Sequence, residues 1–218
     1  IAEGPIALCE VQAYAYEAAT GAADLLDALG AGEAGIRPEE LRQWAADLRT
    51  RFRRTYWVET VEGRYPAIAL DRHKLPVDSL TSNIGHLIGT GLLDPDEETG
   101  LASLLLGSVL SSGYGIRTLS TGANGYWPLS YHGGSVWTHD NAIAIFGLSR
   151  AGLHQPARRV AGQLLAAAEA FGWRVPELHG GDADDQVPRP TPYPAACRPQ
   201  AWAAAAAVTA ARALGVPR

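Results

Sequence analysis

Residues 126–141 read YWPLSYHGGSVWTHDN, and they run directly into the apolar segment 142–148. Trp and Tyr rings, two histidines and an Asp-Asn pair surround adjacent glycines, which let a backbone turn sharply or approach a ligand closely. Aromatic faces cover the C–H faces of a pyranose ring, while Asp, Asn and His side chains bond its hydroxyls. The segment therefore predicts a sugar-binding loop that leads into a helix. The alternative is a structural aromatic loop whose histidines are satisfied internally.

Helical periodicity extends to both sides of this loop. Apolar side chains recur at three- and four-residue spacing, and the predicted helices cover residues 6–29, 37–54, 82–89, 94–106, 141–151, 156–171 and 199–214. Only residues 64–70 and 116–119 look extended. Long loops rich in Gly, Pro and aromatic residues lie at 56–81, 106–137 and 172–198, and loops of such length are usually functional. Helix hairpins that alternate with functional loops predict an all-α toroid, whose inner helices start beneath a shared cleft.

Composition limits the possible function classes. The chain has 218 residues, 47% of them hydrophobic, which we read as one domain spanning residues 1–218. The net charge is −5 and the basic residues are scattered, so nucleic acid is not an expected partner. No segment is apolar over the roughly 18 residues that a membrane-spanning helix needs, and we expect a cytoplasmic protein.

Metal and cofactor sites are not predicted. Cys9 and Cys197 lack CxxC spacing, which argues against a zinc site and a disulfide framework, although one bridge between them stays open. His132 and His139 do not have the spacing of a helical HxxxH metal motif. We therefore expect no metal and no cofactor.

Each long loop brings polar and aromatic groups to the start of a helix, where free backbone N–H groups are available. In the segment 75–83, polar side chains either belong to a site or simply cap a helix; they are Asp78, Ser79, Ser82 and Asn83. Arg117 either bonds a substrate hydroxyl or holds a loop through a buried ion pair.

The loop WRVPELH at residues 173–179 gives the most specific catalytic candidate. Glu177 follows a proline and lies beside aromatic and imidazole groups, and the prolines of residues 188–199 would make a rigid pocket wall. A carboxylate in that setting suits a general base that takes a proton from water. The alternative is a surface glutamate. Asp182, Asp184 and Asp185 look like a solvated acidic loop.

Short motifs follow one another in a fixed order along nearly the whole chain. They are PVDSLTSN at 76–83, GIRTL at 115–119, PLSYH at 128–132, VW at 136–137, HDN at 139–141, PEL at 176–178, PYP at 192–194 and PQAW at 199–202. This set resembles the C-terminal part of bacterial amylo-α-1,6-glucosidase (glycogen debranching enzyme-like) proteins. The resemblance implies an (α/α)6 glycoside hydrolase toroid, of which this chain supplies about the C-terminal half. It also implies inverting hydrolysis of α-linked glucosides, with Glu177 as the general base.

The resemblance has two departures and one gap. Thr138 stands where the family usually has proline, and His179 stands where it usually has an aromatic residue. The family's general acid, an aspartate, lies upstream of the segment that matches residues 1–10, so we expect it outside this chain. A half-ring would expose apolar flanks. We therefore expect association with the N-terminal half or with another copy of the chain.

The expected substrate is an oligosaccharide or an α-glucoside. We expect aromatic stacking on sugar by Trp127, Tyr131 and Trp137. We expect hydroxyl contacts, or support of Glu177, from Arg117, His132, His139, Asp140 and Gln200. One alternative is a sugar isomerase or epimerase on the same toroid, in which His132 and His139 transfer the proton. Another is a non-catalytic carbohydrate-binding remnant.

Overall fold

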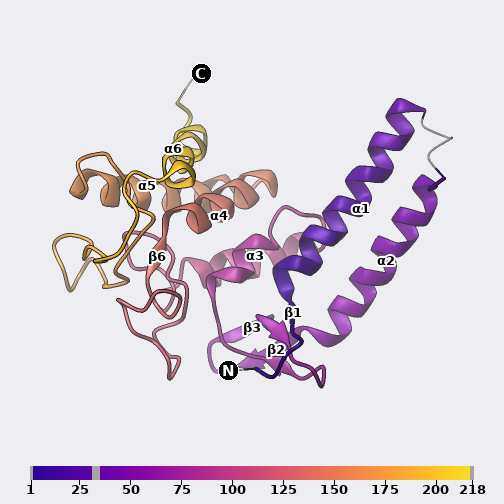
Figure 1. Cartoon of the computed structure of the whole chain (residues 1–218), viewed down its shortest axis with the longest axis horizontal. Coiled ribbons are helices and arrows are strands. Elements are labelled where there is room, and N and C mark those ends of the chain that lie inside the picture. Colours follow the sequence, from indigo (N-terminus) through magenta and orange to yellow (C-terminus); the bar gives the residue numbers. More distant parts are fainter. Residues whose placement is uncertain (1, 31–34, 217–218) are drawn as a thin grey trace.

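Helices dominate the computed structural model, which describes residues 2–30 and 35–216 (Figure 1). Its helices are α1 (Cys9–Leu29), α2 (Pro38–Thr55), the 3-10 helix η1 (Ser82–His86), α3 (Pro95–Leu105), α4 (Thr138–Arg150), α5 (His154–Ala170) and α6 (Ala201–Ala213). Every predicted helix has a counterpart. The segment predicted as a helix over 82–89 forms only the short η1.

Helices α1 and α2 pack side by side as a hairpin, on the right of Figure 1. The helix α1 ends at Gly30, whose φ of 64° is a left-handed conformation that glycine adopts without strain. The helix α2 begins with Pro38 in its first turn, and the Glu40 carboxylate accepts a hydrogen bond from the Arg37 guanidinium at 3.0 Å. The buried positions of α1 are small, Cys9, Ala13, Ala19 and Ala23, so α2 can approach closely.

The main core lies where η1 and α3 meet α4. Its large, almost fully buried side chains include Ile84, Leu87, Ile88, Leu92, Leu101, Leu105 and Ile145. Gly147 of α4 allows the closest approach, because an added Cβ would lie only 2.4 Å from the Ile88 carbonyl oxygen. The helices α5 and α6 pack against α4 on its other sides.

An ionic network joins α2 to the start of α3. Asp94 accepts hydrogen bonds from Arg49 and Arg53, both at 2.5 Å, and Arg53 also bonds Glu97 at 2.7 Å. The backbone N–H of Asp94 donates to the Glu97 carboxylate at 2.8 Å, which completes the cap predicted from the sequence.

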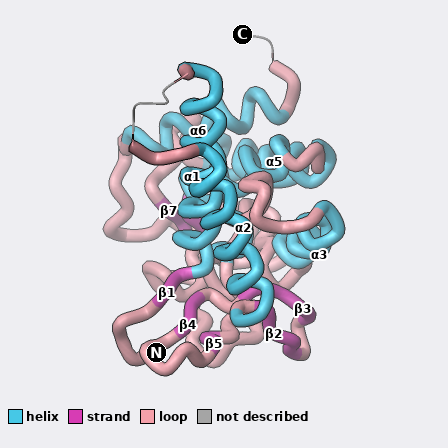
Figure 2. The backbone as a smooth tube through the Cα atoms, turned by 90° about the vertical axis from the view of Figure 1, so that its right-hand side faces the viewer, coloured by secondary structure: helices cyan, strands magenta, loops and turns pink. Residues whose placement is uncertain are grey.

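Three small sheets make the all-α prediction incomplete. They pair β1 (Ala7–Leu8) with β4 (Ala69–Leu70) and β5 (Pro76–Val77), β2 (Trp57–Thr60) with β3 (Gly63–Pro66), and β6 (Val136–Trp137) with β7 (Leu178–His179). The predicted extended segment 64–70 is divided between β3 and β4, and residues 116–119 form only isolated bridges. The strands β1 to β5 gather beneath the helices (Figure 2).

The two cysteines are free thiols, Cys9 buried and Cys197 exposed, so the bridge left open by the sequence does not form. Within residues 2–30 and 35–216, no helix combines the length and the apolar character needed to cross a membrane.

Candidate active site

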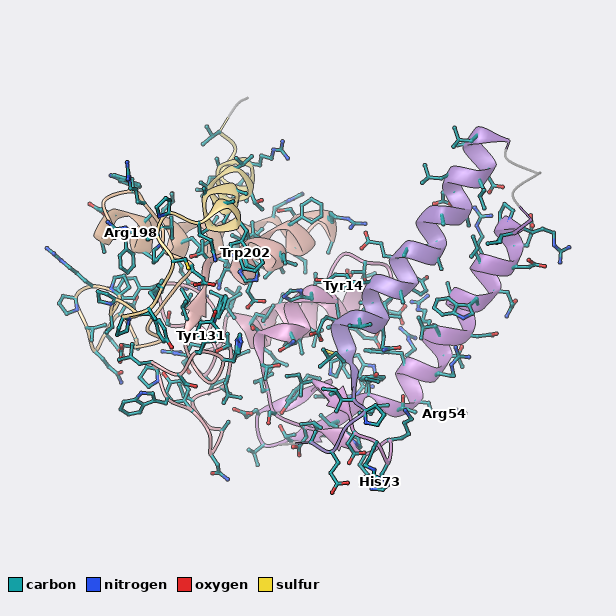
Figure 3. The ribbon with its side chains drawn as sticks, in the orientation of Figure 1. Tyr14, Arg54, His73, Tyr131, Arg198 and Trp202 are labelled. Atoms are coloured by element: carbon teal, nitrogen blue, oxygen red, sulfur yellow. The ribbon has the colours of Figure 1, made fainter. Side chains whose placement is uncertain are left out.

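A cleft of about 660 Å³ lies where the first turns of α1, η1, α4 and α6 come together. Its lining residues are Leu8, Glu10, Ile68, Thr81, Ser82, Asn83, His86, Thr118, Tyr131, His132, Trp137, His139, Asp140, Glu177 and Trp202. In Figure 3, Tyr131 and Trp202 lie on the same side of the molecule, and Tyr14 of α1 lies across from them. Long loops therefore do bring polar and aromatic groups to helix starts around one shared cleft, as the sequence predicts.

Glu177 is held at a junction of three chain segments. Its backbone N–H donates to the Cys197 carbonyl at 3.0 Å, and its own carbonyl accepts from the Thr138 N–H at 3.1 Å. Its carboxylate accepts one hydrogen bond from the Cys197 N–H at 3.2 Å and a longer one from the Tyr131 hydroxyl at 3.4 Å. Only 7% of Glu177 is exposed, so the surface-glutamate alternative is wrong. The carboxylate is fixed by uncharged donors, and no lysine or arginine bonds it among the described residues.

Asp140 forms a second fixed carboxylate, paired with His86. The His86 Nε2 and Asp140 Oδ1 atoms are 2.5 Å apart, and the Tyr14 hydroxyl bonds the Nδ1 atom of the same ring. Burial raises the pKa of Asp140, but the hydrogen bond and charge of His86 outweigh it, so the pKa lies below its usual value. Burial lowers the pKa of His86, whereas Asp140 and Glu10 raise it above its usual value. Both changes favour an imidazolium-carboxylate pair.

Glu10 adds a third carboxylate to the cleft. It lies in the first turn of α1, and its Oε1 atom accepts a hydrogen bond from the Asn83 side chain at 2.8 Å. Asn83 therefore contributes to the cleft wall. The sequence analysis did not single out Glu10 or His86, because an acidic residue in a first turn is also a common response to the helix dipole.

The aromatic residues form a connected wall. Trp137 is only 6% exposed, its indole N–H donates to the Tyr131 carbonyl at 2.7 Å, and His132 stacks on its ring at 5.0 Å. Tyr131 meets the Trp137 ring edge-on at 4.7 Å. Trp202, which the sequence analysis did not select, stacks on His139 at 4.1 Å. Burial lowers the pKa of His139, which favours its neutral form.

Three predicted site residues lie outside the cleft lining. Trp127 is 63% exposed in the loop before β6, and Gln200 precedes the first residue of α6. Arg117 is 2% exposed and forms no ion pair with any residue that the structure describes. Its guanidinium instead donates to three backbone carbonyls, of Gly181 at 2.5 Å, Ser108 at 2.9 Å and Ser111 at 2.8 Å. Arg117 therefore holds loops together, as the second of its two predicted roles has it, but through backbone carbonyls and not through an ion pair.

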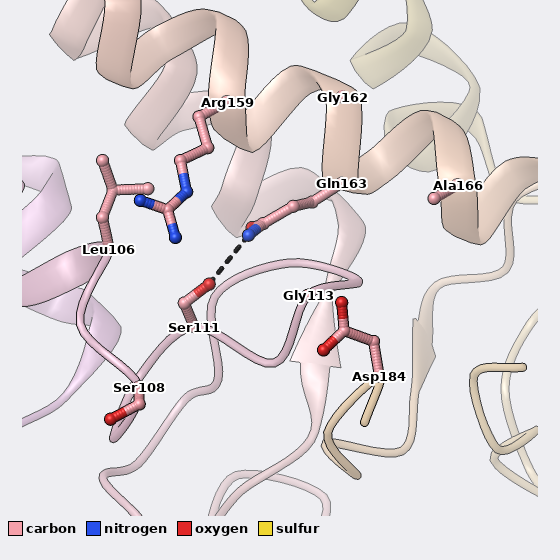
Figure 4. A pocket seen from close by; sticks show the side chains of 9 residues that line it. All are labelled: Leu106, Ser108, Ser111, Gly113, Arg159, Gly162, Gln163, Ala166 and Asp184. Atoms are coloured by element: carbon pink, nitrogen blue, oxygen red, sulfur yellow. Dashed lines mark hydrogen bonds between the residues drawn. The ribbon is translucent and has the colours of Figure 1, made fainter. Parts of the chain in front are cut away.

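A second hollow of about 520 Å³ shares no lining residue with the cleft (Figure 4). It lies between α5 and the loop that Arg117 holds, and Gln163 donates a hydrogen bond to the Ser111 hydroxyl at 2.8 Å across it. Asp184 lines it, so this member of the predicted acidic loop faces a hollow. No aromatic side chain lines it, and it differs in that respect from the cleft. Among residues 2–30 and 35–216 no cluster of three or more His, Cys, Asp or Glu side chains is arranged to hold a metal ion.

Comparison with known proteins gives a family and a fold. The model of the mannosylglycerate hydrolase MGH1-like glycoside hydrolase domain matches residues 4–174, a range that ends just before Glu177. No curated protein sequence matches significantly.

Similar solved structures include an uncharacterized conserved protein from Thermus thermophilus, with a TM-score of 0.70 and 16% identity over 94% of this chain and 46% of that one. The GH63 mannosylglycerate hydrolase of the same organism, in complex with glucose, has a TM-score of 0.68 and 16% identity over 94% of this chain and 45% of that one. Neutral trehalase from Saccharomyces cerevisiae has a TM-score of 0.71 and 13% identity over 96% of this chain and 38% of that one. The chain therefore spans less than half the length of these structures.

Proposed function

Because the chain belongs to the family of mannosylglycerate hydrolase MGH1-like glycoside hydrolase domains, we propose that its cleft hydrolyses α-glucosidic linkages with inversion, using Glu177 as the general base. The observation that carries this proposal is the Glu177 carboxylate, fixed in the cleft wall by the Cys197 N–H at 3.2 Å and the Tyr131 hydroxyl at 3.4 Å. Family membership favours hydrolysis over the isomerase or epimerase alternative.

The chemistry assigned to Glu177 follows from the requirements of inversion. A water molecule between the base and the sugar loses a proton to the Glu177 carboxylate while its oxygen attacks the anomeric carbon. The glycosidic bond breaks on the opposite face, and the leaving oxygen takes a proton from an acid. The two carboxyl groups must then stand about 6.5–9.5 Å apart to leave room for the water. The hydrogen bonds from Tyr131 and Cys197 hold the carboxylate in place in the cleft wall.

The acid is proposed to come from outside this chain. Asp140 is a poor acid, because its pKa is lowered and its carboxylate pairs with His86. The solved relatives are more than twice as long as the chain, which supports a contribution from the part of them that it does not cover. We accordingly infer that residues 1–218 form the C-terminal half of one (α/α)6 toroid. Glu10, which also lines the cleft, is the internal candidate that this proposal must exclude.

The proposed substrate class is a neutral α-glucoside, with an amylo-α-1,6-glucosidase-like linkage as the finer possibility from the sequence motifs. The similar solved structures include a mannosylglycerate hydrolase and a trehalase. Direct assay of different glycosides therefore has to decide the linkage and the partner sugar. The residues proposed to contact sugar are those of the cleft wall, Tyr131, His132, Trp137, His139 and Asp140. A cytoplasmic location is supported by the two free thiols, since disulfides are rare in that compartment.

Substitution of Glu177 in the full-length protein tests the proposal. Glu177→Gln should reduce turnover on an α-glucoside by on the order of 10²-fold or more, the range for loss of a general base, with little change in sugar binding. Glu10→Gln is the matched control, because Glu10 is the other glutamate that lines the cleft, and the proposal predicts that this variant keeps most of the turnover. Turnover of Glu177→Gln within a few fold of the wild type would remove Glu177 from the mechanism.

The isolated chain provides a second test. If the acid lies elsewhere, residues 1–218 alone should release no glucose from maltosaccharides, and light scattering should show association with another copy, or with the N-terminal half once that half is added. A monomer that cleaves substrate would mean that the acid lies within the chain, with Glu10 as the first candidate. An intact cleft that binds sugar but does not hydrolyse it in the full-length protein would support the non-catalytic remnant instead.

A further inference from the structure

Trp202 combines two properties that no other described tryptophan shares. It lines the cleft together with Glu177, and 50% of its surface is exposed. Trp137 also lines the cleft, but only 6% of it is exposed. The remaining strongly exposed tryptophans, Trp44, Trp127 and Trp173, do not line the cleft. Trp202 therefore offers a ligand in the cleft the larger exposed indole surface.

The Trp202 ring is supported from behind. The His139 imidazole lies parallel to it, with a centroid distance of 4.1 Å and an interplanar angle of 13°. His139 meets the Trp137 ring edge-on, at 5.5 Å and 85°. One face of Trp202 is thus occupied by a partner that the wall holds in place, so a ligand that stacks on the ring has to use the opposite face. A ring fixed in this way loses little conformational entropy when it binds a ligand.

Ring contacts relate Trp202 to the proposed base. Tyr131 bonds the Glu177 carboxylate and contacts Trp137, Trp137 contacts His139, and His139 stacks on Trp202. A sugar ring held at Glu177 therefore faces the Tyr131 end of this wall. Trp202 stands at the other end, three ring contacts away, in the position for an adjacent ring.

The charge of the cleft defines the ligand further. Its lining residues include the carboxylates of Glu10, Asp140 and Glu177, and no lysine or arginine among the described residues. An anionic group next to Trp202 would meet these carboxylates, and the imidazolium of His86 is already paired with Asp140. The apolar C–H face of a neutral pyranose fits the indole better.

We propose that Trp202, backed by His139, is the stacking platform for a neutral sugar ring adjacent to the ring that is hydrolysed. The cleft then prefers glycosides of two or more neutral rings. Glycosides whose leaving group is anionic, or too small to stack on an indole, are poorer substrates. This inference rests on the proposed function of the cleft.

A comparison of one-ring and two-ring substrates in the full-length protein tests it. Trp202→Ala should lower kcat/KM on maltose and isomaltose by about tenfold or more, the range for removal of an aromatic anchor. The same variant should stay within about twofold of the wild type on α-glucosyl fluoride, which has no second ring. Trp202→Phe should retain most of the activity on the disaccharides. Trp44→Ala removes a similarly exposed indole from α2 and should leave kcat/KM unchanged on the disaccharides and on α-glucosyl fluoride.

Equal losses of Trp202→Ala on both substrates, or no loss on either, would overturn the inference. The affinity for maltotriose, measured by titration in a Glu177→Gln background, tests the platform without requiring turnover. It therefore distinguishes failure of this inference from failure of the proposed function. Weaker binding on addition of Trp202→Ala, but not of Trp44→Ala, supports the platform even if Glu177 proves not to be the base. A lowered Tm with unchanged maltotriose affinity would make Trp202 a packing residue, and the proposal would be wrong.

Discussion

His179 should make the protein less stable at mildly acidic pH. It lies in β7, is fully buried, and packs against Phe171 with a ring distance of 5.8 Å. Its Nδ1 atom is 2.9 Å from the Gly180 carbonyl oxygen, while its Nε2 atom is buried without a partner in the described structure. Contacts with the Gly180 and Tyr114 backbones and the charge of Asp182 favour the protonated ring, but the cost of burying its charge outweighs them. Burial lowers the pKa of His179 from 6.5 to about 4.

The sign and size of the effect follow from that pKa. Between pH 6.5 and 4 the unfolded chain binds the proton more readily than the folded protein, so stability falls as the pH falls through this range. One pKa unit corresponds to about 1.4 kcal/mol, so the shift amounts to roughly 3 kcal/mol in full and about 2 kcal/mol between pH 7 and pH 5.

Urea unfolding of His179→Asn at pH 7 and pH 5 measures this contribution. Asparagine can still donate to the Gly180 carbonyl but takes no charge. The decrease in the free energy of unfolding from pH 7 to pH 5 should therefore be about 2 kcal/mol smaller in His179→Asn than in the wild type. The smaller side chain should lower stability at both pH values, and this part cancels in the difference. His154→Asn, at an exposed histidine of α5, should leave the wild-type pH dependence unchanged. The same pH dependence in His179→Asn and the wild type would refute the reasoning.

Two further substitutions test the packing around the cleft. Trp137→Ala should lower the free energy of unfolding by roughly 3–5 kcal/mol, as for large buried aromatic residues, because the ring is 6% exposed; unchanged denaturation with weaker sugar binding would instead make Trp137 a free platform. Gly147→Ala should lower stability by about 1–3 kcal/mol, since the new Cβ would lie 2.4 Å from the Ile88 carbonyl oxygen. Gly162→Ala is its control, because nothing lies within 4 Å there, and equal Tm values for both variants would contradict the close approach of α4.

The helices were predictable because their signals are local. Apolar spacing and the Asp94-Pro95 start fix α3 without reference to the rest of the chain, and the observed cap uses those residues. The β2–β3 hairpin was missed for a local reason too. Its turn contains Val61, which is fully exposed, where a hairpin turn usually has Asn or Gly, so the apolar pattern gave no turn signal.

The cleft was predictable where its residues share a loop with distinctive chemistry. Tyr131, His132, Trp137, His139 and Asp140 all come from one segment and do line it. Glu10 and Trp202 come from the starts of α1 and α6 and His86 from the end of η1, and their convergence depends on how the helices pack. Arg117 shows the same limit, because the sequence could not reveal that its partners are backbone carbonyls, one of them that of Gly181 in a distant loop.

The product anomer released first tests the central claim most directly. The full-length protein should be mixed with α-glucosyl fluoride and the glucose followed by proton NMR before mutarotation. If Glu177 directs water to the face opposite the leaving group, β-glucose should appear first, and Glu177→Gln should produce it at least about 100-fold more slowly. Initial release of α-glucose, or equal rates in the wild type and Glu177→Gln, would contradict Glu177 as the base of an inverting hydrolase.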